Sequence, residues 1–195
     1  AMTARTALTL AAALAAPAAP AADAPPATFW VYFGTYSGGK NDGKGGVFRS
    51  EFDPATGKLS EPVVAADVGN PSFVSPNPDG KVLYAVGEGG GKDGGPLHAF
   101  KIDPATGGLT KLAGSTTGGS GPCHVATDAA GKFAVAANYG GGSCAVFKLG
   151  ADGGVEARTH FEQHKGGSNA DPARQKGPHA HCGAFHPNGK FIYVA

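Results

Sequence analysis

One stretch near the end of the chain gathers the side chains best suited to acid–base chemistry. Arg174 is followed, after three residues, by Pro-His-Ala-His, whose histidines are His179 and His181. Two imidazoles that face one cavity can act as general base and general acid near neutral pH. The planar guanidinium of Arg174 can bind a carboxylate or a phosphate. We therefore expect His181, His179 and Arg174 to be catalytic; the alternative is that they are surface-loop residues without a role.

The orientation of the two histidines follows if they open a β-strand. Alternate residues of a strand point to the same side of the sheet, so His179 and His181 would face one cavity. Together with Cys182 and His186 they could also bind zinc. The spacing supports a metal poorly, because Cys182 should alternate to the opposite face. We therefore expect a site without a metal.

A repeated phrase identifies the elements that must position these residues. The turn glycines Gly80, Gly131 and Gly189 are 51 and 58 positions apart, which are the differences 131−80 and 189−131. Two Asp-Pro-Ala-Thr-Gly turns, 53–57 and 103–107, are 50 positions apart (103−53). A period near 50 built from short apolar runs is typical of a β-propeller with one four-stranded blade per repeat. The sequence therefore predicts an all-β fold.

The repeats amount to about three and a half blades between residues 28 and 195. A propeller typically closes a ring of four to eight blades, and an open half-ring leaves unpaired strand edges. We therefore expect the chain to hold the N-terminal part of a longer propeller. The alternative is that two half-rings associate to close one ring.

Equivalent positions in the earlier repeats add three candidates for substrate binding. Glu88 ends a strand in the second repeat, and Asn138 ends the matching strand in the third. The phrase Ser120-Gly-Pro-Cys-His124 in the third repeat matches Gly177-Pro-His-Ala-His181 in the fourth, which makes His124 a candidate. His124 could instead be a hydrogen-bonded core residue, and Asn138 could be a turn-former.

The first residues differ in kind from the repeats. Arg5 precedes an apolar run over 7–16, and Ala-Pro-Ala at 19–21 offers a cleavage site. This order is typical of a secretory signal peptide, and the run is too short to span a membrane. We therefore predict a signal peptide over 1–22 and a protein that is periplasmic or secreted; the alternative is a disordered Ala/Pro leader.

Composition narrows the classes of partner. The formal net charge of +1 provides no basic surface for nucleic acid. The sequence has three cysteines, Cys123, Cys144 and Cys182, and no Cys-x-x-Cys motif. Because the number is odd, we expect the cysteines to be small buried side chains rather than a disulfide framework. The P-loop, Rossmann, Gly-x-Ser-x-Gly and His-Glu-x-x-His patterns do not occur in the sequence.

An ordered set of phrases resembles the lactonase family of seven-bladed propellers, the group of bacterial 6-phosphogluconolactonases and fungal carboxy-cis,cis-muconate cyclising enzymes. The resemblance covers about 29–195, and its most specific phrase is the one that runs from Arg174 to His181. The other matching phrases are Tyr32-Phe-Gly-Thr-Tyr36, the turn at 52–59, Asn70-Pro-Ser-Phe73 with Ser75, Gly119-Ser-Gly-Pro122 and Ala137-Asn-Tyr-Gly-Gly-Gly-Ser143.

The resemblance implies a seven-bladed ring that hydrolyses a sugar-acid lactone, or closes one, without a metal or an organic cofactor. By analogy His181 or His179 would move the proton and Arg174 would bind the substrate anion, while Glu88 is a weaker match. The family also places functional residues in later blades. The competing hypothesis is an exported, non-catalytic propeller that binds a protein or a carbohydrate at the cell surface.

Overall fold

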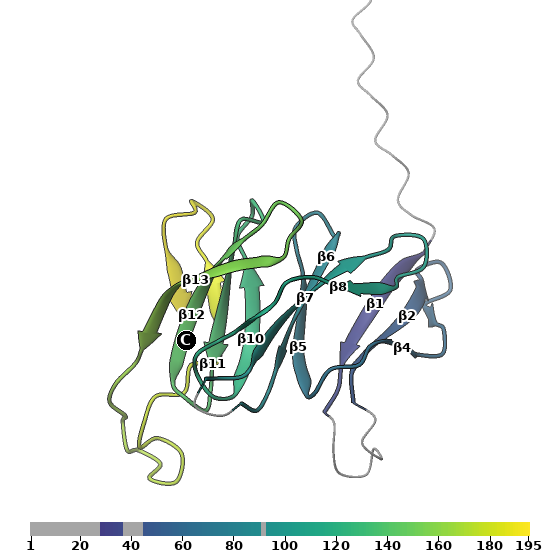
Figure 1. Cartoon of the computed structure of the whole chain (residues 1–195). Helices are drawn as coiled ribbons and strands as arrows, with labels where there is room; N and C mark the ends of the chain where they lie inside the picture. The colour runs from purple at the N-terminus through teal and green to yellow at the C-terminus, as the bar shows by residue number, and fades with distance from the viewer. Residues whose placement is uncertain (1–27, 37–44, 91–92) are drawn as a thin grey trace, which may run out of the picture.

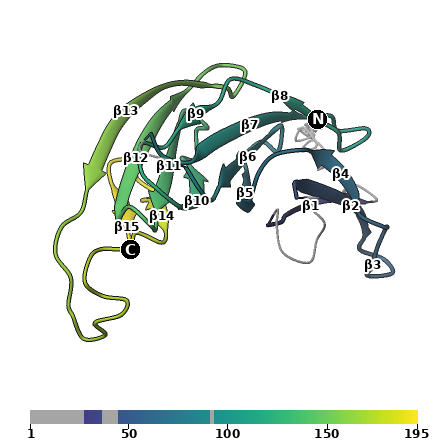
Figure 2. The ribbon, with the colours of Figure 1, turned by 60° about the horizontal axis from the view of Figure 1, so that its bottom comes forward.

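The chain folds into antiparallel sheets that follow one another along an arc (Figures 1 and 2). The computed structural model describes residues 28–36, 45–90 and 93–195, and every regular element in these ranges is a β-strand. The all-β prediction is therefore confirmed. The predicted signal peptide, 1–22, lies outside the described residues. No helix in the described part of the chain has the length and hydropathy that a transmembrane span requires.

Four sheets correspond to four successive blades. The first blade contains β1 (Phe29–Gly34), β2 (Val47–Asp53), β3 (Lys58–Leu59) and β4 (Val63–Ala66), and the second contains β5 (Pro71–Pro76), β6 (Val82–Gly87), β7 (Pro96–Ile102), β8 (Leu109–Lys111) and β9 (Ser115–Thr116). The third blade contains β10 (Pro122–Thr127), β11 (Phe133–Asn138), β12 (Ser143–Leu149) and β13 (Val155–Gln163). The fourth contains β14 (Gly183–Phe185) and β15 (Ile192–Val194).

The outer strand of the first two blades is broken into two pieces. β3 and β4 both pair with β2, and β8 and β9 both pair with β7. Residues 58–67 therefore do not form one continuous strand. Pro62 has no N–H to donate to the ladder, and it lies between the two pieces of the first blade.

The first sheet begins at the second strand of its blade. Tyr32 on β1 donates its phenol proton to Gly107 O over 2.9 Å, and Tyr84 on β6 donates to Gly153 O over 2.7 Å. Both acceptors lie in the turn after the third strand of the next blade, so β1 is equivalent to β6. No described strand pairs with the other edge of β1.

The blades are held together because their central strands are apolar on both faces. All six residues of β6 are buried. Val82, Tyr84 and Val86 pack against the third blade, whereas Leu83 and Ala85 pack against the first. A strand buried on both faces reads as a continuous apolar run, as Val82–Gly87 does.

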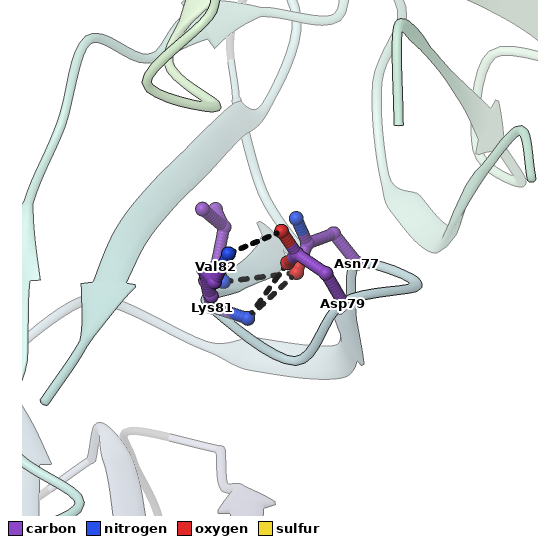
Figure 3. A network of polar contacts seen from close by, with 4 residues as sticks. All are labelled: Asn77, Asp79, Lys81 and Val82. Carbon is purple, nitrogen blue, oxygen red and sulfur yellow. Dashed lines mark hydrogen bonds and ion pairs between the residues drawn. The ribbon is translucent and has the colours of Figure 1, made fainter. Parts of the chain in front are cut away.

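Short polar turns fix the register between the first and second strands of the second and third blades. Figure 3 shows the turn between β5 and β6, where Asn77 Oδ1 accepts hydrogen bonds from the main-chain N–H groups of Lys81 and Val82, both at 3.0 Å. Asp79 Oδ1 also accepts from Lys81 N at 3.0 Å. Asp128 repeats the arrangement between β10 and β11, with distances of 2.7 and 2.8 Å. These side chains favour the turn over other conformations because they satisfy its backbone donors.

The connection from the third to the fourth blade carries the histidine phrase. It leaves β13 after Gln163 and enters β14 at Gly183. The turn between β11 and β12 presses against it: a Cβ on Gly142 would lie 2.2 Å from Pro178 O, and Gly142 has φ +60°. Glycine at 142 therefore sets how closely the connection approaches the third blade.

Tyr84→Phe is expected to destabilise the fold by roughly 1–3 kcal/mol, because it leaves the buried Gly153 carbonyl without its donor. Burial raises the pKa of Tyr84 from 10.0 to about 12. As the pH rises, the Tyr84 phenol therefore loses its proton in the unfolded chain before it does so in the folded protein. The contribution of Tyr84 to the free energy of unfolding is complete below about pH 10 and is lost as the pH rises through 12. Urea unfolding from pH 7 to 12 should show this alkaline loss in the wild type and a smaller one in the variant. Tyr193→Phe, at an exposed position, is the control and should shift stability by no more than about 0.5 kcal/mol.

Gly142→Ala is expected to destabilise the protein by about 1–3 kcal/mol more than Gly57→Ala, because only the former displaces the backbone of Pro178. Gly57 has φ +70° and nothing within 4 Å of a built Cβ, so it is a control for the backbone strain alone. Thermal unfolding of both variants measures the difference, and equal losses would contradict the close approach.

Candidate functional site

An open cleft of about 450 Å³ lies at the end of the blades where the second strand of a blade ends and the first strand begins. It receives residues that follow β6 and β11, the start of β10, and the connection into β14. Loops at this end of a propeller surround the mouth of the central channel. The residues that line the cleft are Glu88, Gly121, Cys123, Tyr139, Gly140, Arg174 and His181.

Tyr139 brings the three predicted catalytic residues together. Its phenol oxygen accepts a hydrogen bond from Arg174 Nη2 at 2.8 Å. Its main-chain oxygen lies 2.9 Å from His179 Nδ1, and a carbonyl only accepts, so Nδ1 carries the proton. The ring of Tyr139 stacks on His179 at 4.5 Å between centroids, and His181 meets it edge-on at 5.6 Å. One side chain thus contacts all three candidates.

The two histidines converge by a different route from the one expected. Residues 178–182 are irregular and β14 begins at Gly183, so the prediction that they open a strand is wrong. The main-chain N–H groups of His181 and Cys182 both donate to Ala195 O, at 2.7 and 3.2 Å. A pair of residues on one strand that lies opposite a single residue of the partner strand is a β-bulge. A bulge interrupts the alternation of side chains between the two faces of the sheet and changes the direction of one side chain.

The bulge recurs at the same place in the two preceding blades. The pairing of β5 with β6 shifts between Pro71 and Phe73, and that of β10 with β11 shifts between Pro122 and His124. The bulged residues are thus Ser72, Cys123 and, in the fourth blade, His181. Cys123 and His181 both line the cleft, so the bulge is the device that turns this position toward it.

Glu88 lies in the cleft and joins the first two blades. Tyr36 donates its phenol proton to Glu88 Oε1 at 2.7 Å, and this hydrogen bond is the main reason that the pKa of Tyr36 is raised. Tyr36, Glu88 and Tyr139 each follow the second strand of their blade. Sequence reasoning missed both tyrosines, although their equivalence to Glu88 was a signal that could have found them.

His124 lies behind the cleft rather than in it. Its ring packs on Phe73 at 4.4 Å, its Nδ1 accepts from Gly183 N at 3.3 Å, and its Nε2 lies 3.7 Å from Cys182 Sγ. Burial, followed by the charge of His181, lowers the pKa of His124. These contacts make His124 a support between the third and fourth blades.

Asn138 also lies behind the cleft. It is completely buried, and its Nδ2 donates to Ser143 Oγ at 3.0 Å. A Cβ on Gly119 would lie 2.4 Å from this nitrogen, so the backbone packs directly against the amide. Neither Asn138 nor His124 lines the cleft as the predicted substrate-binding role requires.

The alternative zinc ligands are not assembled. His186 lies at the far end of β14, where its Nδ1 accepts from Asn188 N and its ring contacts Phe191 and Tyr193. Across 28–36, 45–90 and 93–195, no three His, Cys, Asp or Glu side chains are placed to hold a metal ion. The imidazole of His181 and the guanidinium of Arg174, which line the cleft, are groups suited to proton transfer and anion binding.

A larger cavity, of about 610 Å³, lies at the opposite end of the blades among the turns 77–81, 129–132 and 150–153. Two of its lysines are neutralised locally, Lys81 by Asp79 at 3.4 Å and Lys148 by Glu156 at 2.6 Å. It contains none of the imidazoles or the arginine named above, and we therefore place the candidate site in the smaller cleft.

Comparison with known proteins agrees with this architecture. A family model described as "Lactonase, 7-bladed beta-propeller" matches residues 30–195. A 6-phosphogluconolactonase of Bacillus subtilis is 34% identical over 161 residues, which are 83% of this chain and 44% of the relative. The chain thus spans about half the length of the curated relatives it matches.

Solved structures give the same picture. A structure described as a putative 6-phosphogluconolactonase from Bacteroides uniformis superposes with a TM-score of 0.77 and 34% identity, covering 87% of this chain and 47% of that one. A periplasmic gluconolactonase of Pseudomonas aeruginosa gives 0.75 and 27%, covering 86% and 47%. With the repeated blades and the cleft at their mouth, these matches show that the chain belongs to the lactonase family of seven-bladed β-propellers.

Proposed function

We propose that the protein hydrolyses a sugar-acid lactone, as a 6-phosphogluconolactonase does, at the cleft around Tyr139. The observation that carries this proposal is the convergence of Arg174, His179 and His181 on one tyrosine. Relatives named 6-phosphogluconolactonase in Bacillus subtilis and Formosa agariphila, 34% and 30% identical, support the same reaction class.

His181 is the proposed general base. A lactone carbonyl is opened by a water molecule whose proton is removed as the water attacks. His181 lines the cleft, whereas the Nδ1 proton of His179 is engaged by Tyr139 O. This hydrogen bond fixes the orientation of the His179 ring, and that ring in turn packs against Tyr139 beside the base.

Arg174 is the proposed binding group for the substrate's anionic end. Only its Nη2 bond to Tyr139 is seen, and no carboxylate among the described residues forms an ion pair with it. A guanidinium has five N–H donors in a planar fork, so most of them remain for a carboxylate or a phosphate. Glu88, on the facing blade, would orient the hydroxyl groups of the sugar.

We also propose that the protein acts in the periplasm or outside the cell. The signal-like order of residues 1–22 supports export, and the Pseudomonas aeruginosa relative is itself described as periplasmic. A phosphorylated sugar acid is typically cytosolic, so an unphosphorylated lactone is the substrate to test beside 6-phosphogluconolactone.

His181→Ala in the full-length protein is expected to lower kcat for the best lactone by roughly 10²–10⁴-fold, because it removes the base. Turnover should be followed by proton release on 6-phosphogluconolactone and a panel of unphosphorylated aldonolactones, with and without chelator. Wild-type turnover should survive the chelator.

His160→Ala is the matched control, because that imidazole is exposed on β13, where it lies 3.6 Å from Glu162 and away from the cleft. It should leave turnover unchanged. An active wild type with an equally active His181→Ala variant would remove His181 from the mechanism. A wild type that opens no lactone would favour the alternative, a propeller that binds a protein or a carbohydrate.

A further inference from the structure

The proposed hydrolysis needs one more group, a donor for the oxyanion. When water adds to the lactone carbonyl, the carbonyl oxygen becomes negatively charged, and a preorganised donor aimed at that oxygen lowers the barrier. His181 takes the proton of the water and Arg174 binds the distant anion, so neither serves this oxygen.

Tyr139 has a phenol proton available for that purpose. A guanidinium has no acceptor, so in the bond with Arg174 the phenol oxygen accepts and its own proton stays free. No acceptor for that proton is seen among the described residues, whereas the hydroxyl protons of Tyr36, Tyr32 and Tyr84 are all engaged. Tyr139 also lines the cleft, where a ligand can accept the proton.

The Arg174 contact strengthens this donor. A positively charged group on the phenol oxygen draws electron density from it and polarises the O–H bond, as in a chain of hydrogen bonds. It also stabilises the negative charge that the phenol oxygen gains when it donates to an oxyanion. The same guanidinium thus links the anion-binding end of the cleft to the donor.

The donor is held rigidly beside the base. Tyr139 stacks on His179 with an interplanar angle of 24°, and its main-chain oxygen is fixed by His179 Nδ1. His181 meets the same ring edge-on, with centroids 5.6 Å apart. A carbonyl bound in the cleft beside both residues can therefore receive water from the side of His181 and present its oxygen to the phenol, with little reorganisation.

We propose that Tyr139 is a catalytic residue whose phenol donates the hydrogen bond that stabilises the oxyanion; this rests on the proposed lactone hydrolysis. Water forms a bond to the carbonyl carbon while His181 takes its proton, and the carbonyl electron pair moves to the oxygen held by Tyr139. The oxyanion then collapses, the ring C–O bond breaks, and the ring oxygen takes the proton from His181. The product is the open hydroxy acid.

Tyr139→Phe keeps the ring and the main-chain carbonyl and removes only the hydroxyl. It is expected to lower kcat by about 10²–10³-fold, the usual effect of deleting one oxyanion donor, with a smaller change in KM. The assay is the same one, on the full-length protein and its best lactone. Tyr193→Phe, the same chemical change at an exposed site on β15, should leave kcat unchanged.

A double-mutant cycle with Arg174→Gln distinguishes a catalytic role of Tyr139 from a role in positioning Arg174. If the phenol only holds Arg174, adding Tyr139→Phe to Arg174→Gln changes nothing further, and the proposal is overturned. If the phenol serves the oxyanion, the double variant loses at least another tenfold in kcat.

A fluorinated tyrosine at position 139 tests the proton itself and serves where Tyr139→Phe fails to fold. Fluorine acidifies the phenol at little change of shape. Because a phenolate has no proton to donate, turnover should fall at a lower alkaline pH than in the wild type. If Tyr139 served only to hold Arg174, ionisation of the phenol would strengthen that contact and would not lower turnover. An alkaline fall in turnover at the same pH as in the wild type would therefore contradict the role of Tyr139 as a hydrogen-bond donor.

The outcomes distinguish this proposal from the function on which it rests. A wild type that opens no lactone overturns both. An active wild type whose Tyr139→Phe variant keeps kcat within about twofold overturns the role of Tyr139 and leaves the lactonase in place.

Discussion

The packing of sheet on sheet is the constraint on which the rest of this structure depends. Each central strand must bury both of its faces, one against the preceding blade and one against the following blade, as β6 does. Two apolar clusters result, one at each junction of the second blade. Because the driving force is proportional to buried apolar area and has no direction, specific contacts must fix how the blades stand to one another. The phenol bonds of Tyr32 and Tyr84 supply that geometry once per junction.

The same arrangement creates the candidate site. The blades stack along an arc (Figure 2). Residues from the ends of second strands and the starts of first strands line one cleft. At that end the regular ladder gives way to a bulge in each of three blades, and the bulged residues Cys123 and His181 line the cleft. The scaffold is therefore repetitive, whereas the side chains at equivalent places differ. Ser72, Cys123 and His181 show how one backbone device can carry different chemistry.

Local patterns were enough to predict much of the fold. The spaced turn glycines, the two Asp-Pro-Ala-Thr-Gly turns and the alternating apolar runs indicated an all-β propeller, since turns and strand periodicity depend on near neighbours in sequence. Finer points of the fold depend on partners that are distant in sequence. The division of the outer strand into β3 and β4 depends on pairing with β2, and the starting position of β1 within its blade emerges only from the contact of Tyr32 with the second blade.

By itself the sequence determined the repeat and the family resemblance, and it indicated Arg174, His179 and His181 as candidates for chemistry. Only the tertiary structure decided how they meet. The alternation rule describes an uninterrupted strand, whereas the bulge at His181 exists because Ala195 pairs with two residues at once. Likewise the proposed role of Tyr139 rests on contacts with residues 35 and 40 positions away. Asn138 lies outside the candidate site because it is buried, and His124 does so because its ring packs on Phe73 and its Nδ1 accepts from Gly183 N. No pattern within a few residues specifies such contacts, since they form only when one blade packs on the next.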